Sequence, residues 1–231
     1  IMSKILAGIK NISEAKILID SEIDIIDLKD PSNGALGKLE NNDIKDIINF
    51  IGKKKLTSST IGDLPNDENL ISKIVNELSN TDVDFIKIGV YENNYIKTLS
   101  KIRSCKKLIA VFFADKFLPT EEEILILKNS GFSGVMIDTS NKKSGSLFNH
   151  VSDIDVHNFI LSAKNLNLLT GIAGSINSSH INQIAKLNPN YMGFRGALCE
   201  NIQMRNSKIS ASNVKNIIHL VKNSKNIIIN A

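Results

Sequence analysis

The chain has 231 residues, of which 42% are hydrophobic and 23% are charged, and its formal net charge is +4. This composition is typical of globular proteins and excludes an intrinsically disordered chain. The lysines are spread along the sequence without a basic tail or a basic patch with interleaved aromatic residues, so we expect no nucleic-acid partner. No apolar run is long enough to span a membrane, and the first residues do not form a secretory signal. We therefore expect a cytoplasmic protein.

The cysteines and histidines argue against a metal site. Cys105 and Cys199 are too few and too far apart for a disulfide framework or a metal knuckle. The four histidines fall in predicted loops and helices without the spacing of metal ligands. We expect neither a metal nor a cofactor.

Strand-like and helix-like patterns alternate along the chain. Short β-branched runs predict strands at 4–9, 24–29, 55–62, 84–91, 107–114, 134–139, 167–174 and 190–197. Each is followed by apolar residues at helical spacing, at 12–20, 43–52, 68–79, 94–103, 120–131, 156–166, 180–188 and 212–223. Thr120 and Glu123 form a capping box, and Ser210 or Ser212 is the expected N-cap of the last helix.

Eight strand–helix units predict a single (β/α)8 TIM barrel over residues 1–231, since such barrels take about 250 residues. The strands are apolar at most positions, as expected for strands covered by helices. The alternative is a doubly wound open sheet. That architecture usually has a glycine-rich turn after the first strand, and the segment KNISEA (residues 10–15) has none.

Charged residues lie at or near the ends of even-numbered predicted strands. Lys29 ends the second strand, Lys87 lies in the fourth, Asp138 ends the sixth and Arg195 ends the eighth. In a TIM barrel these positions converge on one mouth, and residues from alternate strands share a layer. We therefore expect these four side chains to lie together. Asp27 is two residues before Lys29 and points to the same side of its strand.

Two neighbouring lysines suggest amine chemistry. Each ammonium disfavours the charged form of the other, and a lysine that is neutral near pH 7 can attack a carbonyl group. Either Lys29 or Lys87 is the expected Schiff-base nucleophile, with the other as proton shuttle. Asp138 or Asp27 can orient the amine and transfer protons. Asp27 can equally serve as a structural partner of a lysine.

The loops after the seventh and eighth predicted strands resemble anion-binding sites. IAGSI contains Gly174 and Ser175, and GFRGA contains Gly193, Arg195 and Gly196. Glycines let backbone N–H groups approach a phosphate, and TIM barrels often bind phosphate after strands seven and eight. A phosphorylated small-molecule substrate is therefore expected. Alternatively, Arg195 pairs with Asp138 across the barrel.

Six motifs in order resemble those of the (5-formylfuran-3-yl)methyl phosphate synthases. They are IIDLKDPSNGALG, SSTIGDLP, DFIKIGVY, MIDTSNKKSGSLF, IAGSI and GFRGALC, and together they span residues 25–199. The resemblance implies a barrel lyase of methanofuran biosynthesis. Such an enzyme condenses two molecules of glyceraldehyde 3-phosphate into a furan aldehyde phosphate, with loss of water and one phosphate.

The resemblance also implies roles for individual residues. The Schiff-base lysine of the family's D-[VL]-K-[ND]-P motif falls on Lys29, and an acid/base lysine falls on Lys87. The acid of the M-L-D-T motif falls on Asp138, and a lysine that follows it falls on Lys142 or on its neighbour. After the fifth strand the family pattern is G-Y-A-D, whereas this chain has FFAD, which keeps Asp115 as a substrate contact.

Two other functions remain open from the sequence. One is a different Schiff-base class I aldolase acting on sugar phosphates, and the other is a non-catalytic phosphate-binding barrel. The oligomeric state is also left open, because the outer faces of barrels resemble one another.

Overall fold

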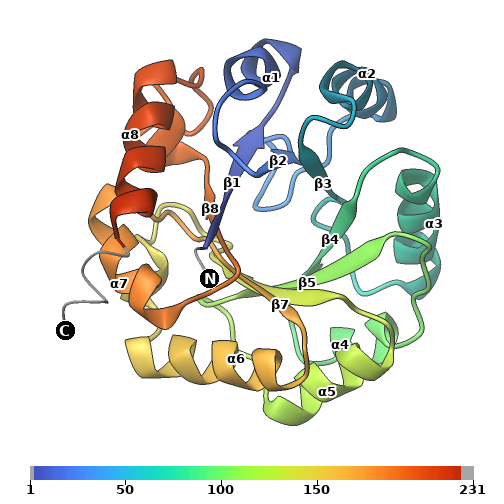
Figure 1. The fold of residues 1–231 in the computed structure, drawn as a ribbon. Coiled ribbons are helices and arrows are strands. Elements are labelled where there is room, and N and C mark those ends of the chain that lie inside the picture. Colours follow the sequence, from blue (N-terminus) through green and yellow to red (C-terminus); the bar gives the residue numbers. More distant parts are fainter. Residues whose placement is uncertain (1–2, 225–231) are drawn as a thin grey trace.

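Eight parallel strands close into a barrel in the computed structural model, which describes residues 3–224 (Figure 1). The strands follow one another in chain order, and β8 pairs with β1. They are β1 (Lys4–Ile9), β2 (Ile25–Leu28), β3 (Leu56–Thr60), β4 (Phe85–Val90), β5 (Lys107–Phe113), β6 (Gly134–Asp138), β7 (Leu169–Ile172) and β8 (Tyr191–Phe194). The predicted (β/α)8 barrel is confirmed.

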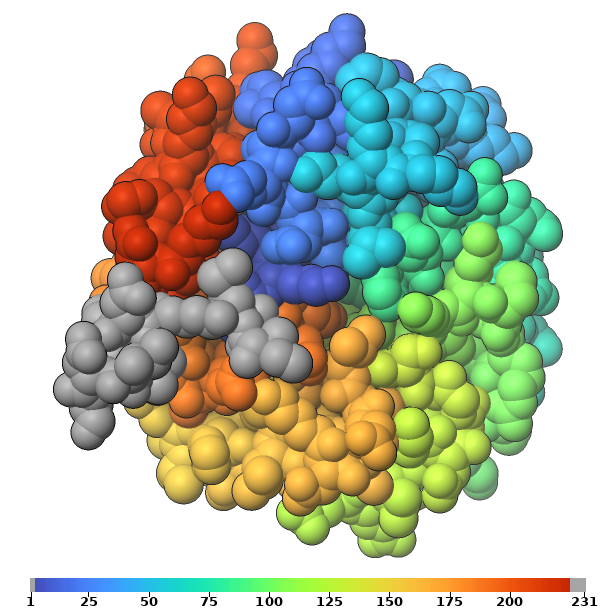
Figure 2. Space-filling view, viewed as in Figure 1, coloured from blue at the N-terminus to red at the C-terminus, as the bar shows by residue number. Residues whose placement is uncertain are grey.

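Helices surround the barrel and follow the strands in turn (Figure 1). They are α1 (Ile12–Leu18), α2 (Asn41–Ile51), α3 (Glu68–Ser79), α4 (Tyr95–Leu99), α5 (Glu121–Asn129), α6 (Asp153–Asn165), α7 (Ile181–Leu187) and α8 (Ala211–Asn223). Within residues 3–224, the loops after β6, β7 and β8 also contain short 3-10 helices, which are η1 (Leu147–Asn149), η2 (Ser178–His180) and η3 (Gly196–Leu198). Figure 2 shows the blue N-terminal and red C-terminal segments side by side where the barrel closes.

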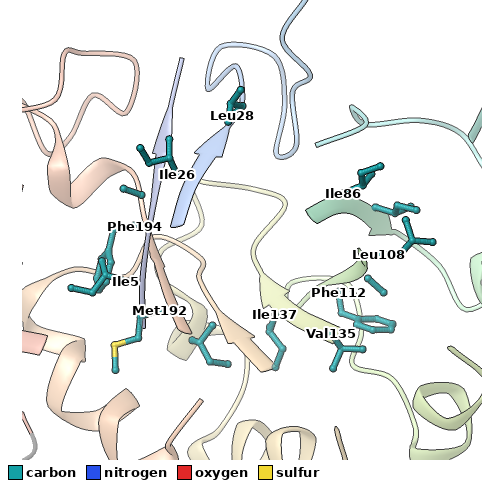
Figure 3. Packing of buried hydrophobic residues seen from close by; sticks show 14 of the residues in the cluster. Ile5, Ile26, Leu28, Ile86, Leu108, Phe112, Val135, Ile137, Met192 and Phe194 are labelled. Carbon is teal, nitrogen blue, oxygen red and sulfur yellow. The ribbon is translucent and has the colours of Figure 1, made fainter. Parts of the chain in front are cut away.

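Alternate residues of each strand face opposite sides of the barrel wall. Ile26 and Leu28 of β2 belong to the large cluster between strands and helices, together with Phe112 of β5 (Figure 3). Ile25 of β2 and Val111 of β5 belong to a second cluster, inside the barrel. Burial of both faces explains why the strands are nearly continuously apolar.

The interior changes from apolar to charged along the strands. Ile25, Phe85 and Met136 are buried in the interior cluster. The residues two positions after each of them are Asp27, Lys87 and Asp138, which are also buried. Because the side-chain period of a strand is two, each charged residue points inward one level nearer the carboxyl end. The lower barrel is thus closed by apolar side chains, and the charged groups lie at its mouth.

Helix caps confirm two predictions and correct a third. The Thr120–Glu123 capping box is present at α5, and Ser210 caps α8 by accepting a hydrogen bond from the N–H of Asn213. Helix α6 begins at Asp153 and not at Val156, because a capping box between Ser152 and Asp155 starts it earlier than its apolar periodicity indicates.

Seven of the eight strands are one to four residues shorter than predicted, and only β1 has the predicted bounds. β7 covers Leu169–Ile172, since Asn167 (φ 55°) and Gly174 (φ 102°) adopt left-handed conformations on either side of it. β2 ends at Leu28 and β8 ends at Phe194, so Lys29 and Arg195 follow their strands and do not end them as predicted. The domain boundaries 1–231 stay a prediction, because residues 1–2 and 225–231 lie outside the described residues. Within residues 3–224, no helix has the length and apolar content needed to cross a membrane.

Candidate active site

A cavity of about 1020 Å³ opens at the carboxyl ends of the strands. The three predicted catalytic residues, Lys29, Lys87 and Asp138, all line it. The other predicted site residues that line it are Asp27, Lys142, Gly174, Ser175, Gly193, Arg195 and Gly196. The fold thus brings together residues that are more than 160 positions apart in the sequence, from Asp27 to Gly196.

Asp27 and Lys87 form a buried ion pair. The Nζ of Lys87 donates to Oδ2 of Asp27 at 2.6 Å, and the side chains are 3% and 0% exposed. Ser58 Oγ donates to the other carboxylate oxygen at 2.6 Å. In the strand register Asp27 of β2 lies beside Ser58 of β3, and Lys87 of β4 lies beside Thr60. The carboxylate therefore has a partner on each oxygen, as a buried charge requires.

Asp138 and Lys142 form a second ion pair at the mouth. The backbone N–H of Thr139 donates to the same Asp138 oxygen at 2.7 Å, and Lys142 Nζ also donates to the carbonyl of Thr139. Burial alone would raise the pKa of the Asp138 carboxyl, but the charges of Lys142 and Lys29 and these hydrogen bonds lower it to about 2. Burial lowers the pKa of Lys142, although Asp138 opposes that effect.

Lys29 differs from both of these lysines. Among residues 3–224 its side chain has no ion-pair or hydrogen-bond partner, although the residue is only 8% exposed. Gly8, which has no side chain, leaves room for Lys29, since a Cβ on Gly8 would lie 3.1 Å from Lys29 Cε. Burial lowers the pKa of the Lys29 amine to about 7, although Asp138 and Asp27 raise it.

The main cause of the pKa shift of Lys29 differs from the one that the sequence predicts. The sequence predicts that the positive charge of a second lysine releases the proton of the first. Burial is the largest cause, and the charges of Lys87 and Lys142 contribute less than burial and less than the opposing carboxylates. Lys87 and Lys142 are each paired with a carboxylate, which weakens their repulsion of the Lys29 ammonium.

Arg195 has a partner other than the one considered from the sequence. Its guanidinium binds Glu14 of α1 through two hydrogen bonds, of 2.6 and 3.1 Å, and not Asp138. Its other hydrogen bonds go to the carbonyls of Gly8, Arg205 and Ser207. All five N–H groups are thus used within the protein. The predicted pairing of Arg195 with Asp138 is therefore wrong. Phosphate binding by Arg195 stays a prediction, and none of its N–H groups is free to donate to a phosphate.

Asp115 lies beside the loop that carries Lys142. Its carboxylate accepts hydrogen bonds from the N–H of Ser140 at 2.6 Å, the hydroxyl of Ser140 at 2.6 Å and the N–H of Asn141 at 2.8 Å. Burial raises the pKa of Asp115, but these hydrogen bonds outweigh it and lower the pKa overall. Asp115 is not among the residues that line the cavity. Its contacts indicate that it holds the β6–α6 loop, and substrate contact stays a prediction.

The loop after β7 turns sharply at the cavity wall. Gly174 (φ 102°) and Ser175 (φ 50°) are both left-handed, and Ser175 is exposed at the mouth. A Cβ on Gly174 would lie 3.1 Å from the backbone nitrogen of Thr139, so the two loops approach closely there. Gly193 and Gly196 also line the cavity. The role of these four positions in phosphate binding stays a prediction.

Asp63 holds the β2–α2 loop in place. It accepts hydrogen bonds from the N–H groups of Ala35 at 2.7 Å and Leu36 at 2.9 Å, and from the hydroxyl of Tyr91. A Cβ on Gly34 would collide with its carboxylate. Asp63 thus links the loops that follow β2, β3 and β4.

Three residues of the site were missed by sequence reasoning. Glu14 could have been found, because it lies one helical turn before Leu18 on the apolar face of α1 and so predicts a buried carboxylate. Ser58 shares an inward face with Thr60, which is a weak signal. Arg205 lies in an irregular segment after η3, where no periodicity places it. No group of three or more potential metal-ligating side chains is found within residues 3–224.

Comparison with known proteins identifies relatives over most of the chain. Residues 5–218 match the model of the 4-HFC-P synthase family. A (5-formylfuran-3-yl)methyl phosphate synthase of Methanocaldococcus jannaschii is 30% identical over 227 residues, 92% of this chain and 97% of the relative. The enzyme of the same name from Archaeoglobus fulgidus is 30% identical over 213 residues, 85% of this chain and 91% of the relative.

Solved structures support the fold. The phosphoribosyl anthranilate isomerase of Thermus thermophilus superimposes with a TM-score of 0.66 at 12% identity, over 96% of this chain and 98% of that one. This likeness concerns the barrel alone, whereas the sequence matches extend over the residues of the cavity. The chain belongs to the 4-HFC-P synthase family.

Proposed function

We propose that this synthase condenses two molecules of glyceraldehyde 3-phosphate into (5-formylfuran-3-yl)methyl phosphate through a Schiff base on Lys29. One phosphate and two water molecules leave, which balances the atoms without an oxidant or a reductant. The observation that carries the proposal is the state of Lys29, a buried amine without an ion-pair partner within residues 3–224 and with a pKa of about 7. The names of the relatives support the product.

The first step uses Lys29 as the nucleophile. Near neutral pH a large fraction of its amine is unprotonated and can attack the carbonyl carbon of a triose phosphate. Loss of water from the adduct gives an iminium ion. Removal of a proton from the adjacent carbon then gives an enamine. The electron pair of the enamine can expel inorganic phosphate from the next carbon, and the enol that results is the carbon nucleophile that bonds to the carbonyl carbon of the second triose phosphate.

The two ion pairs are suited to the proton transfers. In each pair a lysine is hydrogen-bonded to a carboxylate within the same cavity as Lys29, so a proton can be accepted and returned without bulk water. Lys87 with Asp27 is the proposed acid/base pair below Lys29. Asp138 with Lys142 is the pair at the mouth, and its low carboxyl pKa keeps Asp138 ionised to stabilise the iminium ion.

The substrate and the pathway belong to the proposal as well. A furan aldehyde phosphate is a precursor that methanofuran biosynthesis requires, and the family resemblance points there. A different sugar-phosphate aldolase would use the same lysine, so the product separates the two functions.

The test is to incubate the purified chain with glyceraldehyde 3-phosphate and follow ultraviolet absorbance and released phosphate. We expect an ultraviolet-absorbing furan aldehyde and one phosphate for each two trioses consumed. A saturated sugar bisphosphate, with no phosphate released, would replace this function by that of an ordinary aldolase.

A further inference from the structure

We propose that Arg205 binds a phosphate group of the substrate at the mouth of the barrel, and that Arg195 positions Arg205 for this task. The ligand is inferred on the basis of the function proposed above. Arg205 lies in the segment between η3 and α8, and its side chain lines the cavity that contains Lys29.

The ion pairs of the site leave Arg205 without a partner. Lys87, Lys142 and Arg195 each have a carboxylate within 4 Å. Within residues 3–224 no carboxylate makes such a contact with Arg205, although the side chain is partly buried. A guanidinium is charged at all ordinary pH values. The cavity therefore has an unneutralised positive charge, which favours an anionic ligand.

Arg195 and Arg205 also differ in how many of their side-chain N–H groups are hydrogen-bonded. Every N–H of Arg195 has an acceptor within the protein. The Nε of Arg205 is buried and, within the described residues, has no acceptor, while one terminal nitrogen makes a single contact of 3.5 Å to the carbonyl of Gly34. A buried polar group normally has a partner. A phosphate can accept from Nε and a terminal N–H at once, because its oxygens match the guanidinium fork.

The backbone of Arg205 is fixed by the network around Arg195. The Nε of Arg195 donates to the carbonyl of Arg205 at 2.8 Å, and the thiol of Cys199 contacts the same carbonyl at 3.5 Å. The Arg195–Glu14 pair thus anchors the loop, and the side chain of Arg205 extends toward Gly34 on the β2–α2 side. Burial lowers the pKa of Arg205 and Asp138 raises it, which agrees with a place in the mouth near that carboxylate.

The first test uses the unmodified chain, which has three arginines: Arg103, Arg195 and Arg205. Phenylglyoxal modifies exposed guanidinium groups, and peptide mass spectrometry measures the rate at each arginine. We expect inorganic phosphate to slow modification of Arg205 at least threefold and to leave Arg103, which is exposed, unchanged. Equal rates at Arg205 with and without phosphate would overturn the proposal.

The second test compares variants by calorimetric titration with inorganic phosphate at low salt. Arg205→Gln is expected to weaken phosphate binding at least tenfold, and Arg205→Lys to weaken it less. Lys208→Gln removes one exposed charge from the same segment and is expected to bind as the parent does. If Arg205→Gln and Lys208→Gln lose phosphate affinity equally, the loss reflects overall charge alone, and the proposal is overturned. Neither test requires turnover, so a failure here is separate from a failure to make the furan.

Discussion

The Nζ of Lys87 lies 2.6 Å from Oδ2 of Asp27, and both side chains are almost completely buried inside the barrel. In the proposed mechanism, this contact decides which lysine is available for covalent chemistry. Lys87 is held in an ion pair, whereas Lys29, two residues after Asp27 in the sequence, has no such partner within residues 3–224. The apolar frame of the second strand is interrupted by Asp27 and Lys29 because both of them face the cavity.

Breaking the buried pair should be costly. Asp27→Ala leaves the Lys87 ammonium buried without its carboxylate, and we expect a loss of about 3–5 kcal/mol in the free energy of unfolding. Adding Lys87→Met removes the unpaired charge and should recover most of that loss. Glu68→Ala, which breaks the exposed Lys101–Glu68 pair, should cost less than about 1 kcal/mol. Urea unfolding measures all three, and equal losses in the single and double variants would contradict this account.

Lys29 should reduce stability in a pH-dependent way. The unfolded chain keeps the Lys29 proton to a pH of about 10.4, whereas the folded chain releases it near pH 7. The stability of the parent protein therefore rises with pH between these values, because the unfolded state binds more protons.

Replacing Lys29 by methionine should remove that penalty. At about 1.4 kcal/mol for each pKa unit, we expect Lys29→Met to be more stable than the parent by at least about 2 kcal/mol at pH 6. The difference should shrink by pH 9. Urea unfolding of both proteins at the two pH values makes the comparison. A Lys29→Met variant less stable than the parent at pH 6 would show that the charged amine is not penalised.

The rate of adduct formation should depend on the same ionisation. Since the attacking species is the neutral amine, the rate of borohydride trapping with glyceraldehyde 3-phosphate should rise through about pH 7 and level off above it. Asp138, with a pKa of about 2, should add no further step between pH 5 and 9. A midpoint near that of an ordinary lysine would argue that Lys29 is not the nucleophile in its buried form.

The Glu14–Arg195 pair should behave as a unit. Glu14→Ala and Arg195→Ala each leave a buried charge without its partner, so each should destabilise the protein by about 3–5 kcal/mol. The double variant should cost less than the sum of the two. Double-mutant cycles by urea unfolding give the coupling energy, and additive losses would mean that the two side chains act independently.

The sequence predicted the barrel and most of its mouth for a physical reason. Strand and helix periodicities are local, and in a closed parallel barrel all strand ends meet at one edge, so the positions of Lys29, Lys87 and Asp138 follow from topology. The contacts between charged side chains, in contrast, join segments that are far apart in the sequence. The pairing of Glu14 with Arg195 depends on the tertiary packing that brings α1 close to the residue after β8, and the place of Arg205 depends on an irregular loop. Neither has a period that a sequence pattern can reveal.

The central claim is that the amine of Lys29 forms the covalent bond to substrate. The most direct measurement is peptide mass spectrometry of the chain after incubation with glyceraldehyde 3-phosphate and borohydride. We predict a reduced triose phosphate adduct on the peptide that contains Lys29, and none in the Lys29→Arg variant. An adduct on Lys87 or Lys142, or no adduct from a preparation that still makes product, would contradict the claim.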